Sequence, residues 1–176
     1  MPGFMINKFG ADVGDGVAHT TETRRKHRWY FESIAGGLLP SPILLLLKEA
    51  ARPQFTFDEA VMEHNQETAY FAGKQKWAEV KLVWYDAEQP NNVSETMWQW
   101  IDSVVTFGGN LPVKIPGTYK KDAFIVMIKG DGSVNERWAM YGCWPKDVNW
   151  QSLDYGSSDI QTVEVSMRYD RANRVQ

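Results

Sequence analysis

The residues that most often perform chemistry in proteins are few in this chain and widely spaced. The three histidines, His19, His27 and His64, have no histidine or cysteine partner at the spacing of a zinc site. Cys143 is the single cysteine, so the chain forms no internal disulfide, and a nucleophilic role would need a base brought beside it by folding. Because Cys143 precedes Trp144 at a predicted strand end, we interpret it as a small buried apolar residue.

Other patterns that carry chemistry are missing or have a simpler interpretation. No serine stands in a G-x-S-x-G elbow, and no glycine-rich loop opens a helix after a strand. The run Gly130-Asp131-Gly132 resembles part of a calcium loop, but no bidentate glutamate follows, so a hairpin turn explains it better. Asp58 and Glu59 would point to opposite faces of a strand, which makes them a poor acid–base pair. We predict that the protein is not an enzyme and needs no metal or cofactor.

Composition and charge indicate a globular domain with an unusual aromatic content. The chain has 176 residues and a formal net charge of −3, which argues against a general nucleic-acid binder. The basic cluster at residues 24–28 is therefore interpreted as a solvated strand entry or a contact with an acidic neighbouring surface. Eight tryptophans are more than one small core hides, so some are expected at an interface.

Neither the beginning of the chain nor its longest apolar run has the pattern of a targeting or membrane segment. Residues 1–23 are rich in Gly, Asp and Thr, and we predict a loosely ordered arm there, followed by one domain over residues 24–176. No signal peptide is expected, because no basic start precedes an apolar run. The run at residues 43–47 is too short to cross a membrane and is predicted to be a strand buried on both sides.

The element that must position the rest is the C-terminal strand. Residues 160–170 alternate strictly, which is typical of a strand with one face on a core and one face in water. Its apolar row is Val163, Val165, Met167 and Tyr169, and its polar row is Thr162, Glu164, Ser166, Arg168 and Asp170. Before it, residues 142–148 are predicted to be a strand that stops at Trp144-Pro145, and residues 154–159 have the composition of a turn.

Further strands are predicted at residues 27–34 and 54–62. Residues 67–71 and 77–85 are predicted to pair as a long hairpin that turns at residues 72–76. Residues 119–129 and 134–142 are predicted to form a second hairpin that turns at residues 130–133. The first arm of the second hairpin is apolar on both faces, so a helix or another subunit must cover its outer face.

One helix is predicted over residues 94–107. Asn92 or Ser94 can cap its start, Glu95 favours its first turn, and Gly108-Gly109 would end it. Its apolar stripe is expected to pack on a sheet, with a partner-binding groove as the alternative, and consists of Met97, Ile101, Val104 and Val105. The elements together predict a mainly β, mostly antiparallel domain with one packed α-helix.

The C-terminal residues also carry a family resemblance. The string from Gly142 through Trp144-Pro145 and Leu153-Asp154 to residues 159–165 is similar to the C-terminal pattern of the tail tube proteins of T4-type contractile-tailed phages. That family is related in fold to the inner-tube proteins of other contractile injection systems. The resemblance persists back to about Pro53, whereas residues 1–23 do not match the family.

This resemblance implies a fold, an assembly and a set of partners. The implied fold is a β-sandwich or incomplete barrel with a flanking helix, assembled as homohexameric rings whose strands join into one large β-barrel. The rings would stack into a tube in the virion tail, assembled in the host cytoplasm, with genomic DNA passing through the lumen without specific binding. The implied partners are the tail sheath protein and the baseplate and tail terminator proteins. Ring closure would also cover two-faced strands and open sheet edges.

The resemblance assigns roles to two sets of residues. The polar row of the last strand is expected to face the lumen, where a neutral or acidic wall lets DNA slide while a basic wall would hold its phosphates. An ordinary outer surface is the alternative for this row. Residues 63–85 match the region of a long hairpin or loop between stacked rings, so a ring-stacking role is predicted for Thr68, Tyr70, Lys74, Lys76 and Trp77.

Two other functions stay open at the level of sequence. One is a tube-initiating baseplate protein or a secreted ring protein of a related bacterial secretion system. The other is a carbohydrate-binding β-sandwich that uses exposed tryptophans as a platform for sugars. The strands with two apolar faces do not favour sugar binding, because they call for protein cover on both sides.

Overall fold

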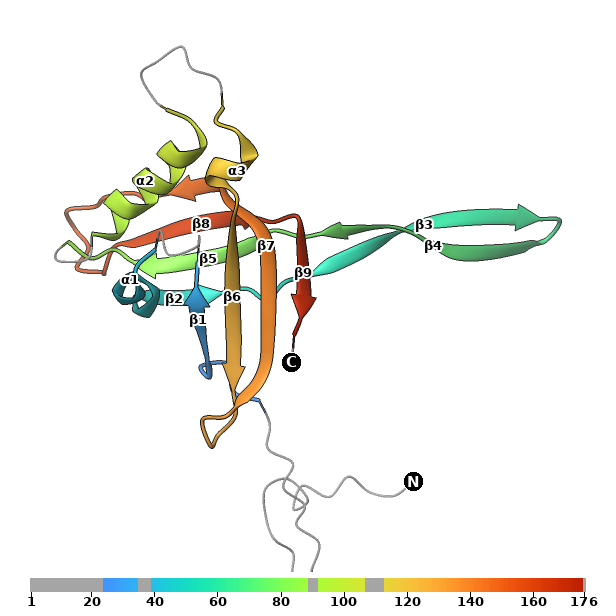
Figure 1. The fold of residues 1–176 in the computed structure, drawn as a ribbon, viewed down its shortest axis with the longest axis horizontal. Helices are drawn as coiled ribbons and strands as arrows, with labels where there is room; N and C mark the ends of the chain where they lie inside the picture. The colour runs from blue at the N-terminus through green and yellow to red at the C-terminus, as the bar shows by residue number, and fades with distance from the viewer. Residues whose placement is uncertain (1–23, 35–38, 89–91, 107–112, 176) are drawn as a thin grey trace, which may run out of the picture.

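The computed structural model of the protein describes residues 24–34, 39–88, 92–106 and 113–175. The predicted arm at residues 1–23 and the predicted helix stop at Gly108-Gly109 lie outside the described residues. The elements, labelled in Figure 1, are β1 (Trp29–Ser33), α1 (Ser41–Leu45), β2 (Leu47–Ala50), β3 (Phe55–His64), β4 (Glu67–Trp77), β5 (Val80–Tyr85), α2 (Val93–Val104), α3 (Pro116–Tyr119), β6 (Lys121–Ile128), β7 (Val134–Asn149), β8 (Thr162–Arg168) and β9 (Arg171–Arg174).

The body is one seven-stranded antiparallel sheet that bends along its longest strand. The strand order is β1-β6-β7-β8-β5-β2, and β9 pairs with β7 off this path. The first half of β7 pairs with β6 on one side and with β9 on the other, whereas its second half pairs with β8. A single strand therefore belongs to two half-sheets. Within the described residues the sheet is not closed, since β1 and β2 stand at its two ends.

The bend in β7 is located at Gly142. Its φ of +69° lies in the left-handed region, which glycine adopts without steric cost. Pairing with β6 reaches Cys143, and pairing with β8 starts at Trp144. The prediction that this strand stops at Trp144-Pro145 is wrong, because β7 continues to Asn149. A register shift after Pro145 accommodates the proline, which cannot donate a ladder hydrogen bond.

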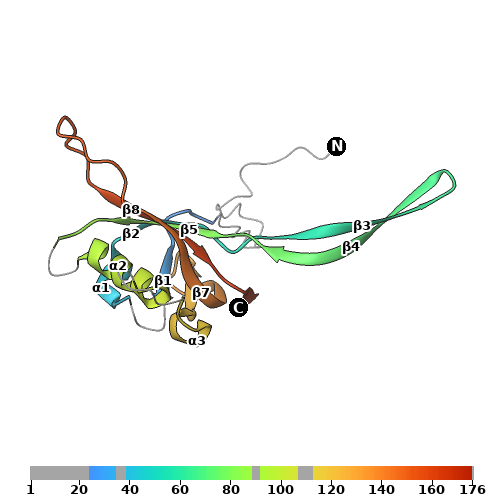
Figure 2. The ribbon, with the colours of Figure 1, turned by 90° about the horizontal axis from the view of Figure 1, so that it is seen from above.

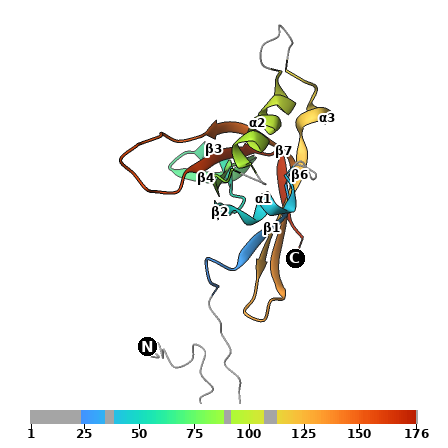
Figure 3. The ribbon, with the colours of Figure 1, turned by 90° about the vertical axis from the view of Figure 1, so that its left-hand side faces the viewer.

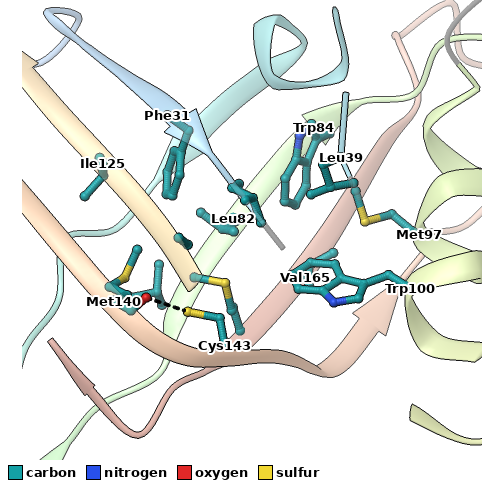
Figure 4. Close-up of a cluster of buried hydrophobic side chains, with 14 of the residues drawn as sticks. Phe31, Leu39, Leu82, Trp84, Met97, Trp100, Ile125, Met140, Cys143 and Val165 are labelled. Carbon is teal, nitrogen blue, oxygen red and sulfur yellow. Dashed lines mark hydrogen bonds between the residues drawn. The ribbon is translucent and has the colours of Figure 1, made fainter. Parts of the chain in front are cut away.

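The core fills the concave side of the bent sheet (Figure 4). Along β8, Val163, Val165 and Met167 are fully buried while the residues between them are half-buried, which confirms the predicted alternation. Side chains from β1, β5, β6, β7 and α2 converge on this row, and those labelled in the figure are Phe31, Leu39, Leu82, Trp84, Met97, Trp100, Ile125, Met140, Cys143 and Val165. Strand β8 is thus the central element of the core.

Helix α2 lies against this core and begins where the sequence predicts. The Asn92 side chain accepts a hydrogen bond of 2.8 Å from the Glu95 backbone N–H, the expected N-cap. Its fully buried residues are Val93, Met97 and Trp100. Of the predicted stripe, Met97 is buried, whereas Ile101, Val104 and Val105 are half-buried. Val105 lies beyond the helix in extended conformation, so the packing face is rotated toward Trp100.

The apolar run at residues 43–47 is not the buried strand that was predicted. Residues Ser41–Leu45 form helix α1, with Pro40 as N-cap residue and Pro42 in its first turn. Proline favours this position because its fixed φ suits a helix start and its missing N–H is not needed there. Ile43 is buried while Leu45 is 84% exposed, so the run is not covered on all sides. Strand β2 starts at Leu47, the last residue of this run.

The predicted pairing of residues 67–71 with 77–85 is also wrong. Strand β4 runs unbroken over Glu67–Trp77 and pairs with β3, from Phe55 opposite Trp77 to His64 opposite Glu67. Asn65, with a φ of 55°, forms the turn. The glycine that suggested a turn, Gly73, sits inside β4 beside a register shift, where an added Cβ would lie 2.8 Å from the Asp58 carbonyl oxygen. Strand β5 instead pairs with β2 and β8.

The second predicted hairpin is confirmed as β6 and β7. It turns through Asp131, whose carboxylate accepts from the Ser133 backbone N–H at 2.8 Å, and Gly132, with a φ of +84°. Both faces of β6 are partly covered. On the outer face, the Arg137 guanidinium lies 5.0 Å from the Phe124 ring centroid and is held by Glu32 at 2.6 Å. Part of the cover expected from a helix or another subunit therefore comes from the chain itself.

The mainly β, mostly antiparallel fold class is confirmed. In Figure 2, α1 and α2 lie on one side of β5 and β8, while the hairpin of β3 and β4 extends beyond the body. No helix in the described part of the chain is long and apolar enough to cross a membrane.

Gly142→Ala should destabilise the fold. The new Cβ would lie 2.4 Å from Oδ2 of Asp170, which Lys120 holds at 2.8 Å, and alanine would be strained at positive φ. We expect a loss of about 1–3 kcal/mol in the free energy of unfolding, measured by urea denaturation. Gly117→Ala is the matched control, because a Cβ there meets nothing within 4 Å. Equal stability of the two variants would contradict the role assigned to the bend.

Candidate functional site

The described part of the chain contains residue types that could bind a metal ion or act as a nucleophile. No group of three or more His, Cys, Asp or Glu side chains there is placed to hold a metal ion. Burial, with the charge of Asp122 as a smaller cause, raises the pKa of Cys143 to about 12. The thiol donates to the Met140 carbonyl oxygen at 3.5 Å, as Figure 4 shows, and is a packed, protonated group at neutral pH. The features that invite a function are surfaces.

The most exposed feature is the hairpin of β3 and β4, here called the arm. All ten residues of β3 and ten of the eleven in β4 are exposed. Strands of this length span roughly 33–36 Å, and Figures 1 and 2 show the arm pointing away from the body. A lone two-stranded hairpin is at best marginally stable in water. The arm therefore lacks a layer that would cover it.

Apolar side chains are exposed on both faces of the arm. Register places Val61 opposite Tyr70 on one face, and Ala60 opposite Phe71 on the other. The large apolar side chains of the arm are 47–68% exposed, and they are Phe55, Phe57, Val61, Met62, Tyr70 and Phe71. Exposed apolar patches of this kind mark contacts with other proteins, with membranes or with ligands.

A row of aromatic rings fixes the base of the arm to the body. The ring centroids of Tyr169 and Trp77 lie 5.7 Å apart, those of Trp77 and Phe55 5.3 Å, and those of Phe55 and Phe57 5.4 Å. The Tyr169 hydroxyl donates to the Gln54 carbonyl oxygen at 3.4 Å. Tyr169 directly follows β8 and is buried, so this row of rings anchors the arm in the core.

The residues predicted to stack rings all belong to the arm. Strand alternation and register place Thr68 and Tyr70 on the face of Val61, and Trp77 at the base of that face. Lys76 lies on the opposite face beside Asp58, with its Nζ 2.9 Å from a carboxylate oxygen. Lys74 follows Gly73 next to the register shift. The structure unites these residues in one arm, although the sequence had placed its turn wrongly.

The polar row of β8 lines the outer face of its half-sheet. Thr162, Glu164, Ser166 and Arg168 are half-buried there. Lys81 of β5 contacts Glu164 at 2.7 Å, and Arg168 lies 3.8 Å from Glu79. This wall therefore carries paired charges of both signs.

Asp170 differs from the rest of the predicted row. It lies between β8 and β9, beside Gly142, and both carboxylate oxygens accept from Lys120 at 2.8 Å. Its side chain supports the bend in β7.

Three strands of the seven-stranded sheet pair with only one neighbour within the described residues. They are β1 and β2 at the two ends of the sheet, and β9, which pairs only with β7. Unpaired strand edges are templates for pairing with another chain, and proteins usually cover them.

A basic pocket of about 690 Å³ lies where residues 24–28 pass β2 and the hairpin of β6 and β7. The cations that line it are Arg24, Arg25, Lys26, Arg28, Lys48 and Arg52, and Glu49 is its single carboxylate. Its apolar lining consists of Trp29, Ala50, Ile125, Met127 and Ile128. The lining of the pocket thus combines cationic and apolar side chains.

Glu136, which no sequence pattern had identified, is the one buried charged residue in the described part of the chain. Its carboxylate accepts from Arg24 and from Trp138 Nε1, and Arg52 lies 3.8 Å away. Burial by itself raises the pKa of Glu136. The hydrogen bonds from Trp138 and Arg24, with the charges of Arg24 and Arg174, outweigh burial and hold this pKa below its usual range.

The connection between β7 and β8 is a second exposed surface, visible as a projecting loop in Figure 3. Leu153 is 87% exposed, and Tyr155 and Ile160 are also exposed. Asp154 and Asp159 hold the loop through short-range bonds, such as the 2.8 Å bond from the Gly156 backbone N–H to Asp154.

Comparison with known proteins gives a consistent family. The family model described as T4-like virus tail tube protein gp19 matches residues 56–173. No curated protein sequence matches the chain.

Solved structures share the fold at low sequence identity. One chain of the anti-feeding prophage cap, described as a tube terminating cap, superposes with a TM-score of 0.68 and 17% identity, covering 92% of this chain and 96% of that one. A chain of the anti-feeding prophage baseplate gives 0.66 and 15%, covering 89% and 97%. A chain of the sheath–tube complex of the extracellular contractile injection system PVC gives 0.56 and 16%, covering 78% and 94%.

Glu136→Gln should lower stability most at neutral pH. Because the folded-state pKa is depressed, the ionised carboxylate stabilises the fold above its ordinary pKa of 4.5, and this contribution is lost as pH falls through the folded-state pKa. We expect a loss of about 1–2 kcal/mol at pH 7 that shrinks in acid, measured by urea denaturation in dilute solution. Glu32→Gln, which alters an exposed ion pair, is the control and should change little. A pH-independent loss at Glu136 would contradict this assignment.

Proposed function

The chain belongs to the T4-like virus tail tube protein family, which makes it a structural component of a contractile tail, and we propose that it builds the inner tube. In this proposal six copies form a ring, and stacked rings enclose a channel through which genomic DNA passes. The tube would lie inside a sheath in the virion tail and would be assembled in the host cytoplasm. Its further partners would be the tail sheath protein and the baseplate and tail terminator proteins.

The observation that carries the proposal is the uncovered arm. Ten residues of β3 and eleven of β4 extend beyond the core with apolar side chains on both faces. Burial of one large apolar side chain contributes about 1.5–3 kcal/mol, so covering the arm by neighbouring copies supplies a strong driving force. Stacking of rings through the arm is the role proposed for Thr68, Tyr70, Lys74, Lys76 and Trp77.

The open sheet supports closure into a ring. Strands β1 and β2 end the sheet, and a neighbour that pairs with such an edge continues the sheet from one subunit to the next. Six repeats of the same heterologous contact close on themselves if the rotation between neighbours fits. A closed barrel leaves no unpaired edge.

The outer face of β8 is proposed as the channel wall. Its charges have both signs, because Lys81 contacts Glu164 while Glu79 contacts both Lys146 and Arg168. The wall is therefore not strongly basic toward a passing polyanion. A strongly basic wall would bind DNA through release of counterions and slow its movement. Thr162, Glu164, Ser166 and Arg168 are the proposed lumen residues, and Asp170 is proposed at the margin of this wall.

A second candidate is a subunit that starts or ends the tube. The cap and baseplate chains superpose over 92% and 89% of this chain, compared with 78% for the sheath–tube complex. Such a subunit would form a single ring instead of a long polymer. The lengths of particles formed by the purified protein, seen by negative-stain electron microscopy, separate the two candidates.

Phe57→Asp combined with Tyr70→Asp should abolish assembly while leaving the monomer folded. Both side chains are exposed on the arm, so the body keeps its core, but a charge in a buried contact costs several kcal/mol. Wild-type protein should sediment as rings or tubes and the variant as a monomer with unchanged circular dichroism. Val113→Asp places the same charge at an exposed apolar residue outside the arm and should assemble normally. A wild-type chain that stays monomeric at high concentration would refute the proposed function.

Glu164→Lys should turn a neutral channel into one that retains DNA. The change replaces an ion pair with Lys81 by two adjacent cations, repeated in every subunit of the wall. Tubes of this variant should bind a short labelled duplex in low salt and release it in high salt, whereas wild-type tubes should not bind. Glu32→Lys reverses an exposed glutamate on the other half-sheet and should not cause retention inside tubes. Equal binding by both variants would exclude β8 as the channel wall.

A further inference from the structure

The arm and the basic pocket are complementary in charge and in apolar character. Between Glu59 and Gly73 the arm carries three glutamates, Glu59, Glu63 and Glu67, and neither lysine nor arginine. Six cations and a single carboxylate line the pocket, and two of these cations, Arg24 and Arg52, contact the buried Glu136. Opposite charges placed on two surfaces guide their encounter and fix the register in which they dock.

The arm and the pocket also both present apolar side chains beside their charged ones. The outer part of the arm exposes Met62, Tyr70 and Phe71 among its glutamates. Trp29, Ile125 and Met127 line the pocket together with its cations. A contact of these two surfaces would bury apolar groups in the middle and leave charge pairs at the margin, the usual arrangement of a protein interface.

The arm cannot fill the pocket of its own chain. In Figures 1 and 2 the arm extends straight out of the body, while the residues that line the pocket lie around the start of β1, the end of β2 and the turn between β6 and β7. A hairpin roughly 33 Å long that points away from the body carries its tip to another molecule. The contact is therefore heterologous, with the arm of one copy against the pocket of the next.

We propose that the basic pocket of each subunit receives the glutamate-bearing tip of the arm of a neighbouring copy. This inference rests on the proposed function, because it needs the chain to assemble, and it adds the surface that receives the arm. It also gives the basic cluster at residues 24–28 a role. Arg24 donates a hydrogen bond to the buried Glu136, and this contact positions the following Arg25 and Lys26 in the lining of the pocket.

Two charge-reversed chains test the proposal in a mixture. The tip variant carries Glu63→Lys and Glu67→Lys, and the pocket variant carries Arg25→Glu and Lys26→Glu, which spares Arg24 and Arg52 beside Glu136. Each variant alone should need at least about tenfold more protein to assemble, because like charges then meet at every contact. Mixed in equal amounts they should co-assemble near the wild-type concentration, since an alternating arrangement pairs opposite charges at both contacts.

Cross-linking identifies the contact directly. Cys143 is buried, so cysteines introduced as Glu63→Cys and Lys26→Cys are the ones available to oxidation. A mixture of these two chains should form an intermolecular disulfide under conditions in which wild-type protein assembles. Ser157→Cys, in the loop between β7 and β8, replaces Glu63→Cys in the control, because that loop also carries exposed apolar and acidic residues.

The outcomes separate this inference from the proposed function. Wild-type protein that fails to assemble overturns both. Wild-type assembly together with normal assembly of each reversed chain, or with no rescue in the mixture, overturns the docking of the arm tip in the pocket and leaves the tube intact. Cross-linking from Ser157→Cys but not from Glu63→Cys would assign the pocket to the loop and would likewise overturn it.

Discussion

A pair of strands without a covering layer cannot bury its own side chains, and the arm of β3 and β4 imposes this constraint on the protein. The arm keeps its shape through one ladder of backbone hydrogen bonds and through the rings of Phe55, Trp77 and Tyr169 at its base. Everything beyond that base gains stability only from contacts with another molecule. The open sheet edges make the same demand at a second location, so the monomer is complete in its core and incomplete at its periphery.

The core explains how a body of this size carries such an extension. Strand β8 supplies a fully buried row, β7 bends at Gly142 so that its two halves serve two half-sheets, and α2 closes one side with Met97 and Trp100. One strand thus continues from one half-sheet into the other, which keeps both in a single cooperative unit. The buried Glu136 and its arginines tie the beginning of the described chain to β7. Membership in the tail tube family fits a protein with a well-packed core and with an arm and strand edges that the chain itself leaves uncovered.

The sequence predicts an element well where the residue pattern of one short segment is enough to determine its structure. The alternation of Val163, Val165 and Met167, the cap at Asn92 and the turn at residues 130–133 depend on local patterns, and the structure has all three. Errors occur where a local pattern has two interpretations. Gly73 suggests a turn but serves a register shift inside a strand, and the apolar run after Pro42 has the length of a strand but forms a helical turn. The pocket and the contacts of Glu136 could not be predicted, because their residues come together only when distant segments fold, as Arg24 and Glu136 do across 112 positions.

The route by which the arm joins the sheet has a mechanical consequence. Strand β4 leads through two residues into β5, which lies inside the sheet between β2 and β8. A pull along β4 would therefore load the hydrogen bonds on both sides of β5 in shear, whereas a pull along β3 would pass through residues 51–54 to β2 at the edge of the sheet. Tension on the two strands of the arm would therefore reach two different strands of the sheet, one in its interior and one at its edge.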